Sequence, residues 1–285
     1  MSYSLKDRKV LITGGSKGLG WAIAQKFAAQ GSHIAINYAS DTEKARTASD
    51  TLRQQYGVRT HICQGDMSDA SDIQNVVAST TDALGGLDVI VSNTAWTRFS
   101  SFADLDALSD EEWEKCYRIN VLGSLRLMKA AKKIFESNPD GGVFLYTAST
   151  AGASISGSSM AYSVTKAAGL QLMKCLAQTQ GPYIRVNSVL PGLLLTDWEF
   201  IRDWEKATPL KSIPEVSHCA DMYVSIAQNK SMTGQQIEIG MSAQSTLSKI
   251  GVSVLRANSH DLGNRLRLVT HPLMNKISNS QHLGD

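Results

Sequence analysis

The sequence predicts an α/β fold of the doubly wound class, with one parallel sheet of seven strands and helices on both of its faces. Two observations lead to this prediction. Short runs rich in β-branched and apolar residues alternate with longer segments of helical period along most of the 285 residues. The short runs also lack a regular alternation of polar residues, as expected for strands that are buried on both faces.

The expected elements follow one another in a regular order. The first run, KVLIT at 9–13, leads through a glycine-rich turn into a helical segment at 18–31. The second run, HIAINY at 33–38, comes shortly before Asp41, a helix-capping residue type, and a helical segment at 42–57. The remaining expected strands are 60–63, 87–93, 142–149, 184–191 and 235–240, and the remaining expected helices are 70–86, 110–137 and 161–178. This alternation favours right-handed crossovers within one parallel sheet.

The regular pattern ends near Ser245. The last forty or so residues contain one short apolar run and no sustained period. We therefore expect one folded domain over 1–245, followed by an appended extension over 246–285 that is ordered only in part.

Composition excludes several classes of function. A net charge of +2 and 19% charged residues give no electrostatic footprint for nucleic acid or for an anionic membrane. The N-terminus lacks the apolar run of a signal peptide, and no stretch is apolar enough to span a membrane. The four cysteines are widely spaced and the six histidines form no close pair, so we expect a cytoplasmic protein with reduced thiols and no metal site.

A glycine-rich loop connects the first strand to the first helix. Thr13 to Gly20 reads TGGSKGLG, and Gly14 permits the turn, Gly18 allows a ligand to approach the backbone, and Gly20 allows helix and strand to pack closely. Backbone amides at such a helix N-terminus bind phosphate groups. Although glycines also serve ordinary tight turns, this position indicates a pyrophosphate-binding loop.

The end of the second strand indicates which dinucleotide binds. A site for NAD has an acidic residue there, which binds the ribose hydroxyls. This chain has NYAS from Asn37 to Ser40, without a carboxylate, and Asp41 is better placed to cap the next helix. Lys17 can face a 2′-phosphate and Ser40 can hydrogen-bond it. The expected cofactor is therefore NADP(H).

Tyr162 and Lys166 lie one helical turn apart and predict acid–base chemistry. The reduction of a carbonyl by a nicotinamide needs a proton donor for the forming alkoxide. We expect the Lys166 ammonium to lower the pKa of Tyr162 from about 10 to about 7, which would suit a general acid or base. The alternative is a packed helix with a lysine that reaches to solvent.

Two further polar residues have positions that suit the same chemistry. Ser149 ends the run at 142–149, at the sheet edge where ligands of this fold class bind, and it can hold the substrate oxygen. Asn120, in the helical segment at 110–137, could hold a water that relays protons from Lys166. Without the other motifs, Ser149 would be interpreted as an ordinary loop residue. Asn120 would be interpreted as a helix residue whose polar atoms are hydrogen-bonded within the protein.

These motifs together resemble the short-chain dehydrogenase/reductases over about 9–243. The resemblance rests on TGxxxGxG at Thr13 to Gly20, GDMSD around Asp66, SNTA at Ser92 to Ala95, and PGLLLT at Pro191 to Thr196. It rests also on TGQ at 233–235 and on Asn120, Ser149, Tyr162 and Lys166. It implies a Rossmann-type catalytic domain in which the last four residues form the catalytic set.

The resemblance also implies a set of cofactor contacts. Asp66 and Met67 would meet the adenine, Thr196 and the backbone near Leu193 would hold the carboxamide, and Lys166 would bond the ribose hydroxyls. The residues expected to contact NADP(H) are Gly14, Ser16, Lys17, Gly18, Leu19, Gly20, Asn37, Tyr38, Ser40, Asp66, Met67, Asn93, Ala95, Tyr162, Lys166, Pro191, Leu193 and Thr196.

Two positions depart from the usual family pattern. SNTA stands where NNAG is usual, which adds a methyl group near the cofactor. EIGMSAQ stands where the chain usually ends in Asp-Gly-Gly, a region that commonly lies at a subunit interface. We expect a homodimer or homotetramer.

The expected substrate is a small or medium apolar ketone, or the corresponding alcohol, of the kind found in secondary metabolism. Trp96, Trp198, Phe200 and Trp204 suggest a pocket that stacks a ring or encloses a hydrophobic chain, unless they are core or subunit contacts. Three alternatives stay open: a cofactor-binding regulatory or interaction protein without turnover, an imine reductase, and a dehydratase on the same scaffold.

Overall fold

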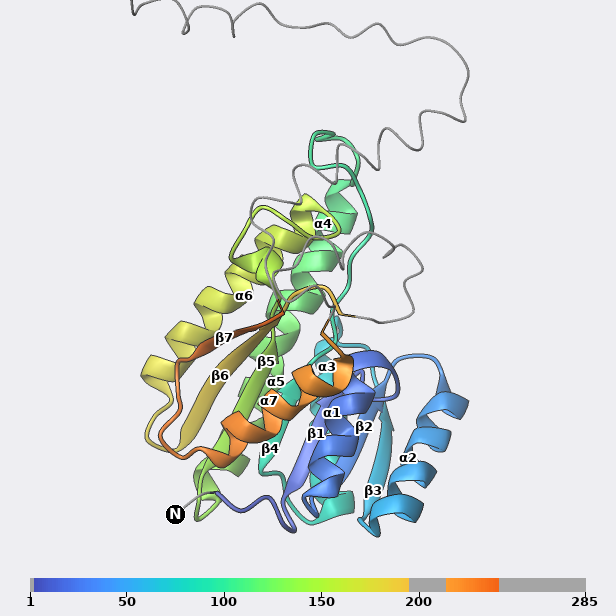
Figure 1. Ribbon diagram of the computed structural model, residues 1–285, viewed down its shortest axis with the longest axis vertical. Coiled ribbons are helices and arrows are strands. Elements are labelled where there is room, and N and C mark those ends of the chain that lie inside the picture. Colours follow the sequence, from blue (N-terminus) through green and yellow to red (C-terminus); the bar gives the residue numbers. More distant parts are fainter. Residues whose placement is uncertain (1–2, 195–213, 241–285) are drawn as a thin grey trace, which may run out of the picture. The chain divides into compact units, whose positions relative to one another are not determined.

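The computed structural model describes residues 3–194 and 214–240 and contains one parallel sheet of seven strands (Figure 1). The strand order is β3-β2-β1-β4-β5-β6-β7, and every neighbouring pair is parallel. The strands are β1 Lys9–Thr13, β2 His33–Tyr38, β3 Thr60–Gln64, β4 Val89–Ser92, β5 Gly142–Thr147, β6 Ile184–Pro191 and β7 Gln236–Ile239. The predicted fold class is confirmed. The strand order reverses direction between β1 and β4, where such sheets bind their ligands.

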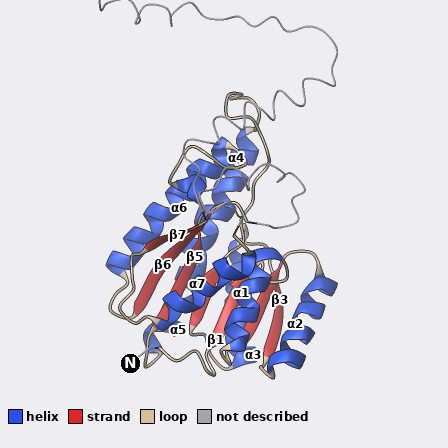
Figure 2. Ribbon diagram, viewed as in Figure 1, coloured by secondary structure: helices blue, strands red, loops and turns tan. Residues whose placement is uncertain are grey.

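Helices cover both faces of the sheet (Figure 2). They are α1 Gly18–Ala29, α2 Thr42–Tyr56, α3 Ala70–Leu84, α4 Asp110–Tyr117, α5 Ser124–Ser137, α6 Met160–Thr179 and α7 Val216–Gln228. One hydrophobic core joins the sheet to α1, α2 and α7, through side chains such as Phe27, Leu52 and Tyr223. A second core joins the other face to α3, α5 and α6, through Val76, Leu127 and Met173. The strands therefore have two covered faces, which explains their continuous apolar runs.

Two helical features differ from the sequence expectations. Helix α7 is not among the expected helices, although its buried residues Cys219, Ala220, Tyr223 and Ile226 have helical spacing. The expected helix at 110–137 is divided by a π-helical stretch at Arg118–Gly123, called η1, which contains Asn120. A single-turn π segment inside a helix commonly marks a functional position.

Helices α2, α3, α4 and α6 each begin with a side-chain cap. The carboxylate of Asp41 accepts from the amide of Lys44 at 2.9 Å, so the predicted role of Asp41 as a cap is confirmed. Ser109 and Glu112 form a reciprocal capping box at the start of α4. No helix among the described residues is both long and apolar enough to cross a membrane. The expected extension at 246–285 lies outside the described residues.

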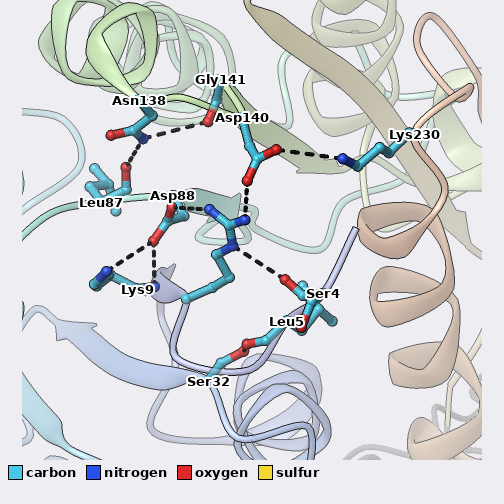
Figure 3. A network of polar contacts seen from close by, with 11 residues as sticks. Ser4, Leu5, Lys9, Ser32, Leu87, Asp88, Asn138, Asp140, Gly141 and Lys230 are labelled. Carbon is cyan, nitrogen blue, oxygen red and sulfur yellow. Dashed lines mark hydrogen bonds and ion pairs between the residues drawn. The ribbon is translucent and has the colours of Figure 1, made fainter. Parts of the chain in front are cut away.

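A polar network ties the N-terminal segment to the amino ends of β1 and β4 (Figure 3). The buried carboxylate of Asp88 accepts from the Arg8 guanidinium at 3.0 Å and from the Lys9 backbone amide at 2.8 Å. Arg8 also pairs with Asp140, which faces Lys230. The network lies at the edge of the sheet opposite the carboxyl ends of the strands, so it supports the fold rather than the site.

Asp88→Ala is expected to lower the free energy of unfolding by about 2 kcal/mol, because it leaves the Lys9 amide and the Arg8 guanidinium without their buried acceptor. Urea unfolding followed by circular dichroism measures this loss. Asp140→Ala is the matched control, because it removes an exposed carboxylate from the same arginine and water screens that pair. Equal losses for the two variants would contradict the role assigned to Asp88.

Candidate active site

Ser149 and Tyr162 meet at the carboxyl edge of the sheet. Ser149 follows β5 and caps a short 3₁₀ helix at Thr150–Gly152, where its hydroxyl accepts from the amide of Ala151 at 3.1 Å. Tyr162 lies in the first turn of α6, which begins after the capping residue Ser159. The Ser149 hydroxyl lies close enough to the Tyr162 phenol to influence its pKa, so the two elements meet here. The structure therefore brings together two residues that are 13 positions apart in the sequence.

The expected lowering of the Tyr162 pKa is wrong for this structure. Burial raises the pKa of Tyr162 to about 12, and the hydrogen bond from Ser149 opposes this rise only in part. Burial also lowers the pKa of the Lys166 amine to about 7, so this amine carries a full positive charge only in acidic solution. The attraction between the two groups is outweighed by the free-energy cost of removing both charged forms from water.

Lys166 is buried one helical turn after Tyr162, and its amine faces β5 of the sheet. Its amine donates to the carbonyl oxygen of Thr147 in β5 at 2.7 Å. The amine lies 5.5 Å from the centre of the Tyr162 ring and 5.1 Å from the centre of the Tyr146 ring. Lys166 is 1% exposed, which excludes the alternative of a lysine reaching to solvent.

Both polar atoms of the Asn120 side chain are hydrogen-bonded to neighbouring residues. Its Oδ1 accepts from the amide of Trp96 at 2.8 Å, and its Nδ2 donates to the carbonyl of Trp96 and the hydroxyl of Thr165, each at 3.0 Å. The thiol of Cys116 also lies 3.2 Å from Nδ2. The side chain therefore orders the loop after β4, and only the Asn120 backbone carbonyl could serve a water near Lys166.

The glycine-rich loop has the backbone conformation that its sequence predicts. Gly14 and Gly18 have φ angles of +62° and +52°, in the left-handed region that favours glycine. A Cβ on Gly20 would lie 2.3 Å from the carbonyl oxygen of Gly14 and 2.7 Å from Nδ2 of Asn93. Asn93 donates to the carbonyl of Thr13 at 3.0 Å, so β4 holds this loop against the start of α1.

The loop fits the pyrophosphate of a dinucleotide. It precedes α1 directly, and no acidic residue stands in the first turn of that helix. The nearby hydroxyl of Thr94 is buried without a hydrogen-bond partner in the described part of the chain, and it lies 3.1 Å from the position of a Cβ on Gly14. A buried polar atom left unsatisfied beside the cradle is consistent with a polar ligand there. Thr94 is one of the three positions at which SNTA departs from NNAG, together with Ser92 and Ala95.

The four residues of NYAS do not share one role. Asn37 is buried, and its amide donates to the carbonyls of Cys63 and Gly65 at 3.3 and 3.0 Å, so this side chain joins β2 to β3. Tyr38 is also buried, whereas Ser40 is exposed. Lys17 is exposed at the start of α1. Of the residues expected to select the cofactor, Lys17 and Ser40 therefore have side chains that a ligand can reach.

The other residues expected to contact the cofactor lie around the carboxyl edge of the sheet. Asp66 is exposed after β3, and Met67 beside it is buried against the core. Ser16, Leu19, Asn93 and Leu193 are half-buried, Ala95 is exposed and Pro191 is buried at the end of β6. Thr196 lies outside the described residues.

Of the aromatic residues expected to line a substrate pocket, only Trp96 is described. Trp96 packs against both the second core and a small cluster with Leu108, Cys116 and Ala161. The Lys115 amine lies 5.1 Å from the centre of its ring. These contacts favour the alternative in which Trp96 is a packing residue. Trp198, Phe200 and Trp204 lie outside the described residues.

Four further residues belong to this site without a motif that predicts them: Tyr146, Thr147, Thr165 and Cys116. Each contacts the expected catalytic residues from β5, α6 or α4. Tyr146 and Thr147 lie in a buried strand and look like ordinary core residues in sequence. Only their distance to Ser149, three and two positions away, gave any signal.

Comparison with known proteins agrees with this geometry. A family model described as short chain dehydrogenase matches residues 8–206. A protein named ketoacyl reductase 2 of the granaticin polyketide synthase, from Streptomyces violaceoruber, is 31% identical over 233 residues, which cover 79% of this chain and 91% of that protein. A sorbose reductase from Schizosaccharomyces pombe is 31% identical over 246 residues, covering 82% of this chain and 95% of that protein.

A solved structure gives the same result. The short chain dehydrogenase from Burkholderia cenocepacia, in complex with NADP, superposes with a TM-score of 0.78 at 27% identity, covering 85% of this chain and 100% of that chain. The sequence matches extend over most of both proteins, and the parallel sheet, the glycine-rich loop and the Ser149–Tyr162 contact are all in place. This chain therefore belongs to the short-chain dehydrogenase/reductase family and is an oxidoreductase acting on ketone- or alcohol-type substrates.

Proposed function

We propose that this protein is an NADP(H)-dependent ketoreductase, which transfers hydride from the nicotinamide to a ketone and produces a secondary alcohol. One observation carries the proposal. The hydroxyl of Ser149 lies close enough to the Tyr162 phenol to influence its pKa, at the carboxyl edge of the sheet that also carries the glycine-rich loop. A substrate oxygen placed between two such hydroxyls would receive two hydrogen bonds.

The roles of the residues follow from their contacts. NADPH, when bound, supplies the hydride. Ser149 holds the substrate oxygen, and Tyr162 gives its proton to the alkoxide that hydride addition creates. Lys166 lies on the opposite side of Tyr162 from this oxygen in our proposal, anchored to the Thr147 carbonyl, and bonds the ribose hydroxyls of the cofactor. Asn120 orders the loop after β4, which borders the cofactor cradle.

The raised pKa of Tyr162 favours the reductive direction. An alkoxide is a far stronger base than a phenolate, so a phenol with a pKa of about 12 still protonates it readily. The oxidative direction needs Tyr162 ionised before the reaction, which such a pKa opposes at neutral pH. We therefore propose that reduction is the faster direction near pH 7.

The choice of NADP(H) over NAD rests on charge. Lys17 and Ser40 are exposed beside the cradle, and the NYAS segment has no carboxylate to repel a 2′-phosphate. The relative from Burkholderia cenocepacia was solved with NADP. Its fold is shared over 85% of this chain, which supports the same cofactor here.

Lys17→Ala is expected to weaken NADPH binding by about tenfold or more and to leave NADH binding nearly unchanged, because only NADPH has the phosphate that the amine would bind. Fluorescence titration of each nucleotide measures the two dissociation constants. Lys129→Ala, which removes an exposed lysine from α5, is the control. Equal weakening of the two nucleotides by Lys17→Ala would contradict the assignment of NADP(H).

The substrate that we propose is apolar or contains a ring. We further propose a cytoplasmic homo-oligomer that acts in secondary metabolism. The decisive experiment is to incubate the purified protein with NADPH and a panel of cyclic, aromatic and aliphatic ketones, and to follow NADPH oxidation at 340 nm. Activity confined to short, highly polar substrates would contradict the proposed substrate class. No oxidation together with undetectable nucleotide binding would contradict the proposed function itself.

A further inference from the structure

The loop after β4 is tied to the chain just before α6 by one pair of hydroxyls and one backbone bond. Oγ1 of Thr97 and Oγ of Ser158 lie 2.6 Å apart, a distance at which one hydroxyl donates to the other. The backbone amide of Ser100 donates to the carbonyl of Ser158 at 2.9 Å. Both bonds end on Ser158, so the loop after β4 fixes this residue through its side chain and its backbone.

Residues 157–159, which we call the lead-in segment, contact Tyr162 twice. Ser159 caps α6, and its hydroxyl accepts from the amide of Tyr162 at 3.2 Å. Gly157 passes along the ring, because a Cβ built on it would lie 3.2 Å from Cδ1 of Tyr162. The φ angle of Gly157 is +107°, a backbone conformation that favours glycine. Ser158, the residue that Thr97 holds, lies between these two contacts.

The hydroxyl of Thr97 stands on a backbone that is itself fixed. The preceding residue, Trp96, has both its amide and its carbonyl bonded to the side chain of Asn120, at 2.8 and 3.0 Å. A side chain can hold a distant segment in place only when its own backbone does not move with that segment. Thr97 meets this condition, and its hydroxyl also lies 3.4 Å from that of Ser159.

We propose that Thr97 is a positioning residue for Tyr162: its hydroxyl holds Ser158 and thereby fixes the lead-in segment, which caps α6 and packs on the phenol ring. The phenol is kept close to Ser149 at the carboxyl edge of the sheet. Thr97 takes no part in proton or hydride transfer itself. The kinetic consequence rests on the proposed function, whereas the contact can be tested in the unliganded protein without turnover.

Thr97→Val tests the contact, because valine keeps the shape of the side chain and removes the hydroxyl. We expect the amides in the first turn of α6 to exchange with deuterium about fivefold faster, since the segment that caps this turn loses a hydrogen bond. Hydrogen–deuterium exchange followed by mass spectrometry measures this change in the unliganded protein. Peptides from the last turns of α6 should exchange at the wild-type rate in the same sample.

The same variant should lower kcat for ketone reduction by about tenfold or more, because a displaced proton donor is no longer aligned with the substrate oxygen. The dissociation constant of NADPH should stay unchanged, since the glycine-rich loop lies on other elements. Thr97→Ser keeps the hydroxyl and should restore both kcat and the slow exchange. Thr179→Val is the matched control, because it removes a hydroxyl that bonds the Cys175 carbonyl near the other end of α6.

Ser158→Ala removes the partner hydroxyl and keeps the carbonyl that accepts from Ser100. If Thr97 and Ser158 act through the bond that they share, breaking it from either side has the same effect. The double variant Thr97→Val with Ser158→Ala should therefore lose no more rate and no more exchange protection than either single variant.

The outcomes separate this proposal from the proposed function. Wild-type exchange in the first turn of α6 in both Thr97→Val and Ser158→Ala would overturn the positioning role. Losses that multiply in the double variant, or a Thr97→Ser variant as impaired as Thr97→Val, would overturn it as well. If exchange changes as expected but the wild-type protein oxidises no NADPH with any ketone, the contact stands and the proposed function fails. A wild-type kcat in Thr97→Val would overturn the positioning role and leave the proposed function intact.

Discussion

Tyr162→Phe is expected to lower kcat for ketone reduction by about 10²- to 10⁴-fold, because it removes the proton donor and keeps the ring in place. Binding of NADPH should persist, since the glycine-rich loop and Lys17 lie on other elements. Initial rates of NADPH oxidation measure the loss, and fluorescence titration of NADPH measures the binding that remains.

Tyr183→Phe controls for the loss of a tyrosine hydroxyl, because Tyr183 is exposed and lies between α6 and β6. Its kcat should equal that of the wild type. A Tyr162→Phe variant that turns over ketone at the wild-type rate would remove Tyr162 from the mechanism. If that variant lost turnover but kept its biological effect in cells, a regulatory or interaction role would gain support over the ketoreductase.

Gly20→Ala is expected to weaken NADPH binding by at least about tenfold, because the cradle has no room for a methyl group. The new Cβ would meet the carbonyl oxygen of Gly14 at 2.3 Å, which is backbone and cannot rotate away. The loop or the first turn of α1 must therefore move, and the amides that would bind the pyrophosphate move with it. Titration with NADPH measures the effect, and thermal unfolding shows how much stability is lost.

The control for Gly20→Ala is Gly181→Ala, in the turn between α6 and β6. No atom lies within 4 Å of a Cβ built there, so the methyl group has open space. Its NADPH affinity should equal that of the wild type. Wild-type affinity in Gly20→Ala as well would show that the loop does not bind the pyrophosphate, and would contradict the cofactor site at its centre.

Burial, rather than the attraction between charges, sets the pKa values of Tyr162 and Lys166 in this structure. The tyrosine and the lysine were expected to assist one another through their charges, and burial dominates instead. A buried phenol keeps its proton and a buried amine loses its charge, since the interior solvates neither ion. Tyr162 is consequently protonated at neutral pH, and under the proposed function it would suit a proton donor to an alkoxide better than a base.

What could be predicted from the sequence depended on local chemistry. The seven strands, the glycine-rich loop and the cap at Asp41 follow from residue types and periods that act within a few positions, so their outlines were right. The pairing of Tyr162 with Lys166 follows from helical spacing, and Ser149 from the end of a strand. Helix α7 had a comparable signal in the spacing of Cys219, Tyr223 and Ile226, and was missed.

Only the tertiary structure decided the surroundings of these residues. The sequence predicts Asn37 as a cofactor contact and does not indicate that its side-chain amide bonds the carbonyl of Gly65, just after β3, at 3.0 Å. For Trp96 the sequence left a substrate pocket and a core contact as alternatives, and the structure packs this ring on the core. Tyr146 reaches Asn120 from 26 positions away, and the depth of burial sets the pKa values of Tyr162 and Lys166. Such contacts and solvation depend on which distant segments meet, and a local pattern of residues does not contain that information.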